Sequence, residues 1–200
     1  MNNNSNQIIK LAQEILNIES EEILKVSKNI SNNFSDAVNE ILKCSGRIVV
    51  SGMGKSGHIA RKIASTFAST GTPAFFMHPG EASHGDLGMI TQEDIVIFFS
   101  NSGQSSELIS ILPTIKRIGA YIISISGNTN SELASQSNIH ISAAVTKEAC
   151  PLGLAPTASS AVSLALGDAL ALCVLDLREF TAEDFARSHP GGNLGNNILI

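Results

Sequence analysis

A run of β-branched residues passes directly into a glycine-rich turn at residues 48–58, which read Ile-Val-Val-Ser-Gly-Met-Gly-Lys-Ser-Gly-His. Together with a helical pattern from about Ile59, this run predicts a buried strand that ends in a loop opening a helix. Glycine lets the backbone come close to a ligand, and the first N–H groups of a helix favour an anion. Lys55 adds a positive charge, and Ser51 and Ser56 add hydroxyl groups. The stretch therefore predicts an anion-binding loop.

Two nucleotide-binding patterns overlap this stretch, and neither is complete. Gly52, Gly54 and Gly57 have the spacing of the dinucleotide fingerprint, which also requires an acidic residue about 20 positions later. The first carboxylate after these glycines is Glu81, beyond a short apolar run. A nucleotide P-loop needs a glycine where this sequence has Val49, so a P-loop is excluded. A tight turn with an incidental lysine stays an open alternative for this segment alone.

Strand and helix patterns alternate from residue 48 onward. Short apolar strands are predicted at residues 48–51, 72–77, 94–100, 121–126 and 139–145. Most of the intervals between them carry helical patterns, and such alternation favours a parallel sheet covered on both faces. The predicted fold class is α/β: a three-layer, doubly wound, five-stranded parallel sheet with the flavodoxin-like strand order 2-1-3-4-5.

The helical pattern before the first strand predicts a separate N-terminal element. Apolar residues recur at spacings of three and four between residues 8 and 42, which is typical of amphipathic helices. Residues 1–45 are therefore predicted to form a helical arm that packs on the domain or, by preference, on a neighbouring subunit. Residues 46–200 are predicted to form the domain itself, with C-terminal helices and a glycine-rich tail that reaches the active site.

Composition limits the partners and the location of the chain. The 200 residues carry a net charge of -5, which gives no electrostatic case for binding nucleic acid or an anionic membrane. The three cysteines lie far apart, as expected in a reducing compartment. The N-terminus has no signal-peptide pattern. The apolar stretch at residues 158–177 is interrupted by Asp168 and predicts a buried helix, so we expect a cytoplasmic protein with no membrane span.

A second polar loop follows the third predicted strand. It contains Ser100, Asn101, Ser102, Ser105 and Ser106 and runs into a helix. In a doubly wound sheet of this order the winding reverses between the first and third strands, and ligands bind there. Serines near helix starts are also common caps. The loop has no lysine or arginine, so hydroxyls and helix amides would contact a single phosphate group. The two loops together predict a phosphate-binding crevice.

Several motifs resemble those of the sugar isomerase (SIS) domain family, and within it the arabinose 5-phosphate isomerases, over nearly all of residues 46–195. The glycine loop and the serine loop are typical of the whole family. The segments Lys-Glu-Ala-Cys-Pro (147–151) and Ser-His-Pro-Gly-Gly (188–192) are far more specific. The motifs that carry the resemblance lie at residues 52–58, 78–88, 100–107, 147–157 and 185–192.

The resemblance implies interconversion of D-ribulose 5-phosphate and D-arabinose 5-phosphate through an enediol, a step toward the Kdo sugar of lipopolysaccharide. It implies a small-molecule sugar phosphate as partner and a homotetramer with shared active sites. It implies no required cofactor. Members of the family usually continue into a pair of CBS domains, whereas this sequence ends at Ile200, so it is either a short form or a trimmed part of a longer chain, and it gives no support for nucleotide regulation through such domains.

The catalytic positions of the family fall on Lys55, Glu107, Glu148 and His189, with His84 in contact with substrate. We expect Glu148, which precedes a proline-pinned loop, to transfer the proton between C1 and C2, and Lys55 to stabilise the enediolate or the phosphate. His84 and His189 are assigned to ring opening and oxygen-proton transfer, in either order. Glu107 is equally compatible with being only a dipole partner at a helix start.

The remaining predicted contacts concern the substrate and a metal. Family members are reported to bind zinc at the position of His78, which would be inhibitory or incidental here. The spacing of His78 and His84 is not a recognised zinc motif. The predicted substrate- and phosphate-binding residues are Ser51, Gly52, Ser56, Gly71, Thr72, Ser100, Asn101, Ser102, Ser105 and Ser106.

Three other functions compete with this prediction. The first is another SIS isomerase, acting on a hexulose or heptulose phosphate, which the Lys-Glu-Ala-Cys-Pro segment disfavours. The second is a non-catalytic sugar-phosphate sensor, which would usually carry a DNA-binding helix-turn-helix ahead of the fold. The third is an NAD-dependent dehydrogenase, for which the acidic partner of the glycine fingerprint is lacking.

Overall fold

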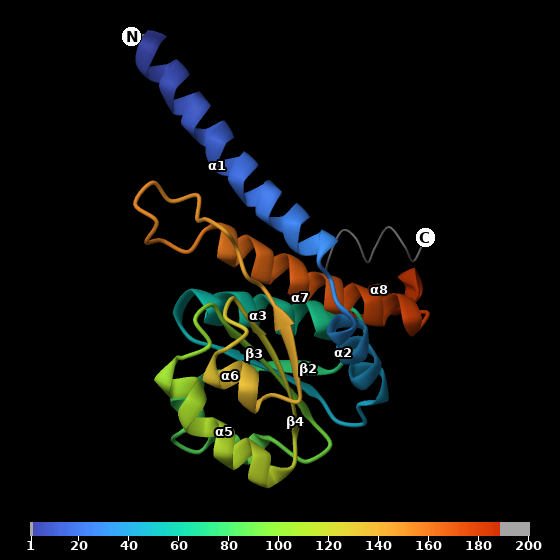
Figure 1. Ribbon diagram of the computed structural model, residues 1–200. Helices are drawn as coiled ribbons and strands as arrows, with labels where there is room; N and C mark the ends of the chain where they lie inside the picture. Colours follow the sequence, from blue (N-terminus) through green and yellow to red (C-terminus); the bar gives the residue numbers. More distant parts are fainter. Residues whose placement is uncertain (1, 189–200) are drawn as a thin grey trace.

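The computed structural model describes residues 2–188 and contains a five-stranded parallel sheet (Figure 1). Its order is β2-β1-β3-β4-β5, so the predicted order 2-1-3-4-5 is confirmed. Each pair of neighbouring strands is parallel. The strands are β1 (Ile48–Gly52), β2 (Ala74–Met77), β3 (Ile95–Ser100), β4 (Tyr121–Ser126) and β5 (Ile139–Ser142).

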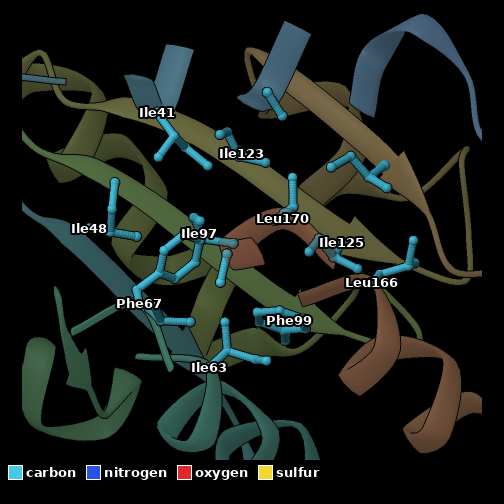
Figure 2. Close-up of a cluster of buried hydrophobic side chains, with 14 of the residues drawn as sticks. Ile41, Ile48, Ile63, Phe67, Ile97, Phe99, Ile123, Ile125, Leu166 and Leu170 are labelled. Atoms are coloured by element: carbon cyan, nitrogen blue, oxygen red, sulfur yellow. The ribbon is translucent and has the colours of Figure 1, made fainter. Parts of the chain in front are cut away.

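Helices cover both faces of the sheet. As a result, the residues of β1 and β3 are buried along their whole length. One face carries α2 (Asn32–Lys43), α3 (Gly54–Ser69) and α7 (Ala158–Leu177), and the other carries α5 (Ser106–Ile118) and α6 (Glu132–Gln136) (Figure 1). Figure 2 shows the core of the first face, where side chains from the sheet meet those of α3 and α7. The buried residues labelled there include Ile63, Phe67, Phe99, Leu166 and Leu170.

Helix α7 is the central helix of that first face. By length and composition it is apolar enough to cross a membrane, and it is the one such helix within residues 2–188. Its Val162, Leu166 and Leu170 side chains are nevertheless buried against the rest of the fold. A Cβ atom at Gly167 would stand 2.6 Å from the Ile63 side chain, so α7 and α3 approach closely. This packing agrees with the prediction of a buried core helix.

Helix α1 (Asn2–Lys28) extends beyond the domain (Figure 1). Its C-terminal half lies along α7, while its N-terminal half carries large apolar side chains that are exposed in this chain. These side chains include Ile8, Ile9 and Leu16, which are 56–65% exposed. The apolar stripe that the sequence predicts is therefore only partly covered within one chain.

Several local boundaries differ from the sequence prediction, among them the start of β2, which lies at Ala74 instead of residue 72. Helix α3 begins at Gly54, five residues earlier than predicted, because its first turn is polar and carries no apolar periodicity. The segment between the second and third predicted strands contains two short helices, α4 (Pro79–Ala82) and η1 (Asp86–Met89). His78 caps α4, since its Nδ1 accepts a hydrogen bond from the Gly80 N–H at 3.2 Å. Strand β5 ends at Ser142 instead of residue 145, and the last described helix is α8 (Ala182–Ser188).

A buried carboxylate ties α1 to the segment that follows β5. Glu22 is fully buried, and its two carboxylate oxygens accept hydrogen bonds from the Thr146 N–H at 2.7 Å and the Thr146 hydroxyl at 2.5 Å. Lys25 donates to both Glu22 and Thr146. Burial alone would raise the pKa of Glu22, but the hydrogen bonds from Lys25 and Thr146 outweigh it and lower the pKa from 4.5 to about 2.

The lowered pKa of Glu22 predicts a loss of stability in acid. Because the folded-state pKa lies below that of the unfolded chain, the stabilisation is complete above pH 4.5 and is lost as the pH falls toward 2. It amounts to on the order of 3 kcal/mol. Urea unfolding at pH 7 and pH 3 should show a smaller pH dependence for Glu22→Gln than for the unaltered chain. Glu40→Gln, which removes a partly exposed partner of Lys43, should keep the full pH dependence. If the free energy of unfolding of the unaltered chain, Glu22→Gln and Glu40→Gln depended equally on pH, the lowered pKa of Glu22 would be contradicted.

Candidate functional site

A polar cleft of about 310 Å³ lies at the carboxyl edge of the sheet, where the winding reverses between β1 and β3. The loop after β1 and the loop after β3 form two of its walls, as the sequence predicts. The start of α7 forms the third. The residues that line it are Met53, Lys55, Ser56, Ile59, Ser100, Asn101, Ser102, Ser105, Pro156, Ser159, Ser160 and Ser163.

Three glycines allow the first wall to form. A Cβ atom at Gly52 would stand 2.8 Å from the Ser56 carbonyl oxygen, and one at Gly57 would stand 2.6 Å from the Gly52 carbonyl oxygen. Gly54 has φ +55°, which side chains disfavour. The turn therefore holds the start of α3 directly against the end of β1. This close contact places Lys55 and Ser56 at the cleft.

The second wall is held by Ser100, the last residue of β3. Its hydroxyl oxygen accepts a hydrogen bond from the Gly103 N–H at 3.1 Å and lies 3.2 Å from the Ser105 hydroxyl. The Ser102 hydroxyl accepts from the Gln104 N–H at 3.2 Å. Gly103 has φ +64° and packs against Ser131. The serines thus fix the turn as well as lining the cleft.

Two long helices point their N-terminal ends toward the cleft. Helix α3 follows Met53, and α5 follows Ser105; within residues 2–188, neither of these N-cap side chains hydrogen-bonds to its helix. The first amides of an α-helix have no partner inside the helix and lie at the positive end of its dipole. Both helix starts are consequently suited to an anion such as a phosphate monoester.

The serines of the third wall were missed by the sequence analysis. Ser159, Ser160 and Ser163 lie in the first two turns of α7 and line the cleft opposite the two loops. From the sequence, residues 158–177 are predicted only to form a buried apolar helix, and none of these serines is assigned to the site. The available signal was three hydroxyls near a helix start, directly after a loop punctuated by prolines.

Glu148 lies on the segment after β5 and is hydrogen-bonded to the start of α7, which forms a wall of the cleft. Its Oε2 accepts hydrogen bonds from the Thr157 N–H at 2.8 Å, the Thr157 hydroxyl at 2.9 Å and the Ser159 N–H at 3.3 Å. Burial alone would raise its pKa, but the hydrogen bonds from Ser159 and Thr157 outweigh that effect and hold the pKa of Glu148 below its ordinary value. Glu148 is therefore an ionised carboxylate at neutral pH, fixed against the α7 terminus.

Of the other predicted catalytic residues, Lys55 is the one described residue that lines the cleft. Lys55 is exposed and lines the cleft. Glu107, in the first turn of α5, is exposed and accepts a hydrogen bond from the Ser106 hydroxyl at 3.1 Å. His84 is exposed in the connection after α4, on the carboxyl side of β2. His189 lies outside the described residues.

Some predicted substrate contacts are not brought to the cleft in this chain. Gly71 and Thr72 precede β2, and Thr72 is buried there. Because α3 runs back across the sheet, its end lies at the amino edge, opposite the cleft. Ser51 is fully buried within β1. Gly52 does not line the cleft, but its lack of a side chain allows the close approach of Ser56. Ser106 is exposed at the start of α5.

The zinc predicted at His78 has no ready set of ligands. Over residues 2–188, no group of three or more His, Cys, Asp or Glu side chains could hold a metal ion. The Nδ1 atom of His78 is already the acceptor that caps α4. A zinc ion at His78 would need ligands from residues beyond those described or from another chain.

The chain is similar in sequence to a known domain family and to proteins named arabinose 5-phosphate isomerase. Residues 41–173 match the SIS domain model. Arabinose 5-phosphate isomerase KdsD of Escherichia coli (strain K12) is 54% identical over 188 residues, which cover 94% of this chain and 57% of that protein. The Pseudomonas aeruginosa KdsD is 52% identical over 192 residues, which cover 96% of this chain and 59% of that protein. The chain thus spans less than two thirds of the length of these curated relatives.

A solved structure covers nearly the same span. The structure of E. coli CFT073 c3406 in complex with arabinose 5-phosphate superposes with a TM-score of 0.90 at 43% identity, covering 92% of this chain and 98% of that one.

Proposed function

Because this chain belongs to the SIS domain family, we propose that it is an aldose–ketose isomerase that interconverts D-ribulose 5-phosphate and D-arabinose 5-phosphate. The observation that carries the proposal is the serine-rich cleft, which lies at two N-terminal helix ends, with the Glu148 carboxylate hydrogen-bonded to the N–H of the lining residue Ser159. The KdsD relatives are named arabinose 5-phosphate isomerases, and the c3406 structure contains arabinose 5-phosphate. The relatives' names and the c3406 complex both support a sugar phosphate as the ligand of this chain.

The phosphate group is assigned to the loop after β3. Ser102 and Ser105 present hydroxyls there, next to the first amides of α5. Hydroxyls and helix amides hold a monoester dianion without a metal ion. The sugar chain would then extend across the cleft toward Lys55 and the serines of α7.

Proton transfer between C1 and C2 is assigned to Glu148. Its carboxylate is ionised at neutral pH, so it accepts the proton without prior deprotonation. A carboxylate of lowered pKa is a weak base, and the enediolate must therefore be strongly stabilised. Lys55 supplies a positive charge for this purpose at the start of α3. His84 and His189 are proposed for ring opening and oxygen-proton transfer. Glu107 is proposed as a further catalytic residue, because it matches a catalytic position of the family.

The same proposal covers cofactor, assembly and location. The isomerisation moves protons only, so no cofactor is needed, and zinc at His78 would be inhibitory or incidental. The exposed apolar half of α1 fits a contact with further copies of the chain in a homotetramer. We also propose a cytoplasmic role in supplying the Kdo sugar of lipopolysaccharide, with which the similarity to proteins named arabinose 5-phosphate isomerase KdsD agrees.

One assay tests the function directly. The purified protein is incubated with ribulose 5-phosphate and a chelator, and the aldose product is identified by chromatography against standards. Arabinose 5-phosphate is the expected product, at a rate that the chelator does not reduce. Ribose 5-phosphate would point to a different pentose isomerase. Sugar-phosphate binding without turnover would instead favour a sensor.

A further inference from the structure

The buried carboxylate of Glu22 has no place in the chemistry proposed above. It lies on α1, outside the residues that line the cleft. Burying a charge is unfavourable unless the charge is paired and hydrogen-bonded, and such a group ties its partners to one geometry. The partners of Glu22 are Lys25 on its own helix and Thr146 on the segment after β5.

Thr146 stands two residues before Glu148. Two residues of extended chain span at most about 7 Å, so a displacement of Thr146 is passed on to Glu148. Both Thr146 groups, its N–H and its hydroxyl, are hydrogen-bonded to Glu22. The intervening Lys147 is exposed and lies 3.7 Å from the exposed Glu21, a contact too weak to replace that anchor.

The segment is anchored again on its far side. The Glu148 carboxylate accepts from Thr157 and Ser159, and the Ala149 N–H donates to the Thr157 hydroxyl at 2.8 Å. Thr157 and Ser159 belong to the start of α7. Helix α1 itself packs along α7. Helix α1, helix α7 and the segment around Glu148 therefore form a closed triangle, of which the contact between Glu22 and Thr146 is one side.

We propose that Glu22 is a positioning residue for the isomerisation: by holding Thr146, it sets the place and orientation of the Glu148 carboxylate beside the cleft. The proposal rests on the function assigned to Glu148 above. It requires that the loss of the Glu22–Thr146 contact weakens the bonds between Glu148 and the α7 start. It also requires that turnover falls more than substrate binding.

Kinetics of Glu22→Gln give the first test. We expect kcat for ribulose 5-phosphate to fall about tenfold, KM to stay within twofold, and the acid limb of the kcat profile to move to higher pH, because Glu148 loses hydrogen bonds that favour its ionised form. Adding Glu22→Gln to Glu148→Gln should have no further effect on kcat. Glu40→Gln, which removes a carboxylate paired with a lysine three residues away on α2, should match the unaltered chain.

Thr146 supplies a second pair of variants in case Glu22→Gln folds poorly. Thr146→Val keeps the shape but removes the hydroxyl, and it should reproduce the loss in kcat. Thr146→Ser restores the hydroxyl and should recover most of the activity. Loss of activity in both, or in neither, would overturn the proposal.

A readout independent of turnover separates this proposal from the proposed function. Hydrogen exchange of the Thr157 and Ser159 amides should quicken at least tenfold in Glu22→Gln, because their acceptor is Glu148. If these amides stay protected and only the melting temperature falls, Glu22 is purely a stabilising residue and the proposal is wrong. If they lose protection but the unaltered chain does not isomerise ribulose 5-phosphate, the coupling holds and the proposed function fails.

Discussion

Replacing Glu148 with glutamine is expected to lower kcat for ribulose 5-phosphate by about 10²–10⁴-fold, the usual contribution of a general base. The affinity for the substrate should change less than threefold, because the carboxylate is not assigned to the phosphate group. The glutamine oxygen can still accept from the Thr157 N–H, so the start of α7 stays capped and the melting temperature should fall little.

Solvent exchange identifies the step that is lost. Exchange of the C1 hydrogen with deuterated solvent, followed by NMR, should disappear together with turnover in Glu148→Gln. Glu93→Gln, which alters an exposed glutamate before β3 at the opposite edge of the sheet, should exchange at the unaltered rate. Exchange that continues undiminished in Glu148→Gln would transfer the base role to another residue.

Gly57→Ala should damage both the fold and the site. The new methyl group would stand 2.6 Å from the Gly52 carbonyl oxygen. Since a Cβ atom cannot rotate away and the oxygen belongs to the backbone, α3 must move away from β1. Overpacking of this kind costs about 1–3 kcal/mol, which lowers the melting temperature by several degrees in a chain of this size. The movement also carries Lys55 and Ser56 away from the cleft, so kcat/KM should fall as well.

Gly88→Ala is the matched control for this change. A Cβ atom at Gly88 would meet no other atom of the described residues within 4 Å, so stability should stay within about 0.5 kcal/mol of the unaltered chain. Thermal unfolding of both variants by circular dichroism makes the comparison. If Gly57→Ala unfolds at the same temperature as Gly88→Ala, the strand and helix do not depend on this close approach.

The parts of the fold that the sequence predicts well are those governed by local patterns. β3 and β4 are continuous apolar runs, and their bounds agree with the prediction to within one residue. The regular alternation of strands and helices predicts the parallel sheet, and the predicted flavodoxin-like order agrees with the structure. Because that order brings the ends of β1 and β3 together, Lys55 and Ser102 could be assigned to one crevice from the sequence alone.

The parts that the sequence analysis missed depend on contacts between distant segments. Ser159 and Ser160 line the cleft because α7 packs over α3, which no periodicity in either helix reveals. Gly71 and Thr72 were expected near the substrate, but the direction of α3 carries them to the other edge in this chain. The anchor between Glu22 and Thr146 joins residues 124 positions apart, and a glutamate on an amphipathic helix gives no sign of it.

The position of α7 in the chain also bears on how the protein is made. The sheet and α3 are synthesised first, while the helix that covers Ile63 and Phe99 follows only after β5. Until residues 158–177 have left the ribosome, the nascent chain exposes one apolar face and the pocket lacks a wall. Folding of this domain therefore cannot finish before α7 has emerged, and a chain stalled before α7 should be a preferred substrate for chaperones and proteases.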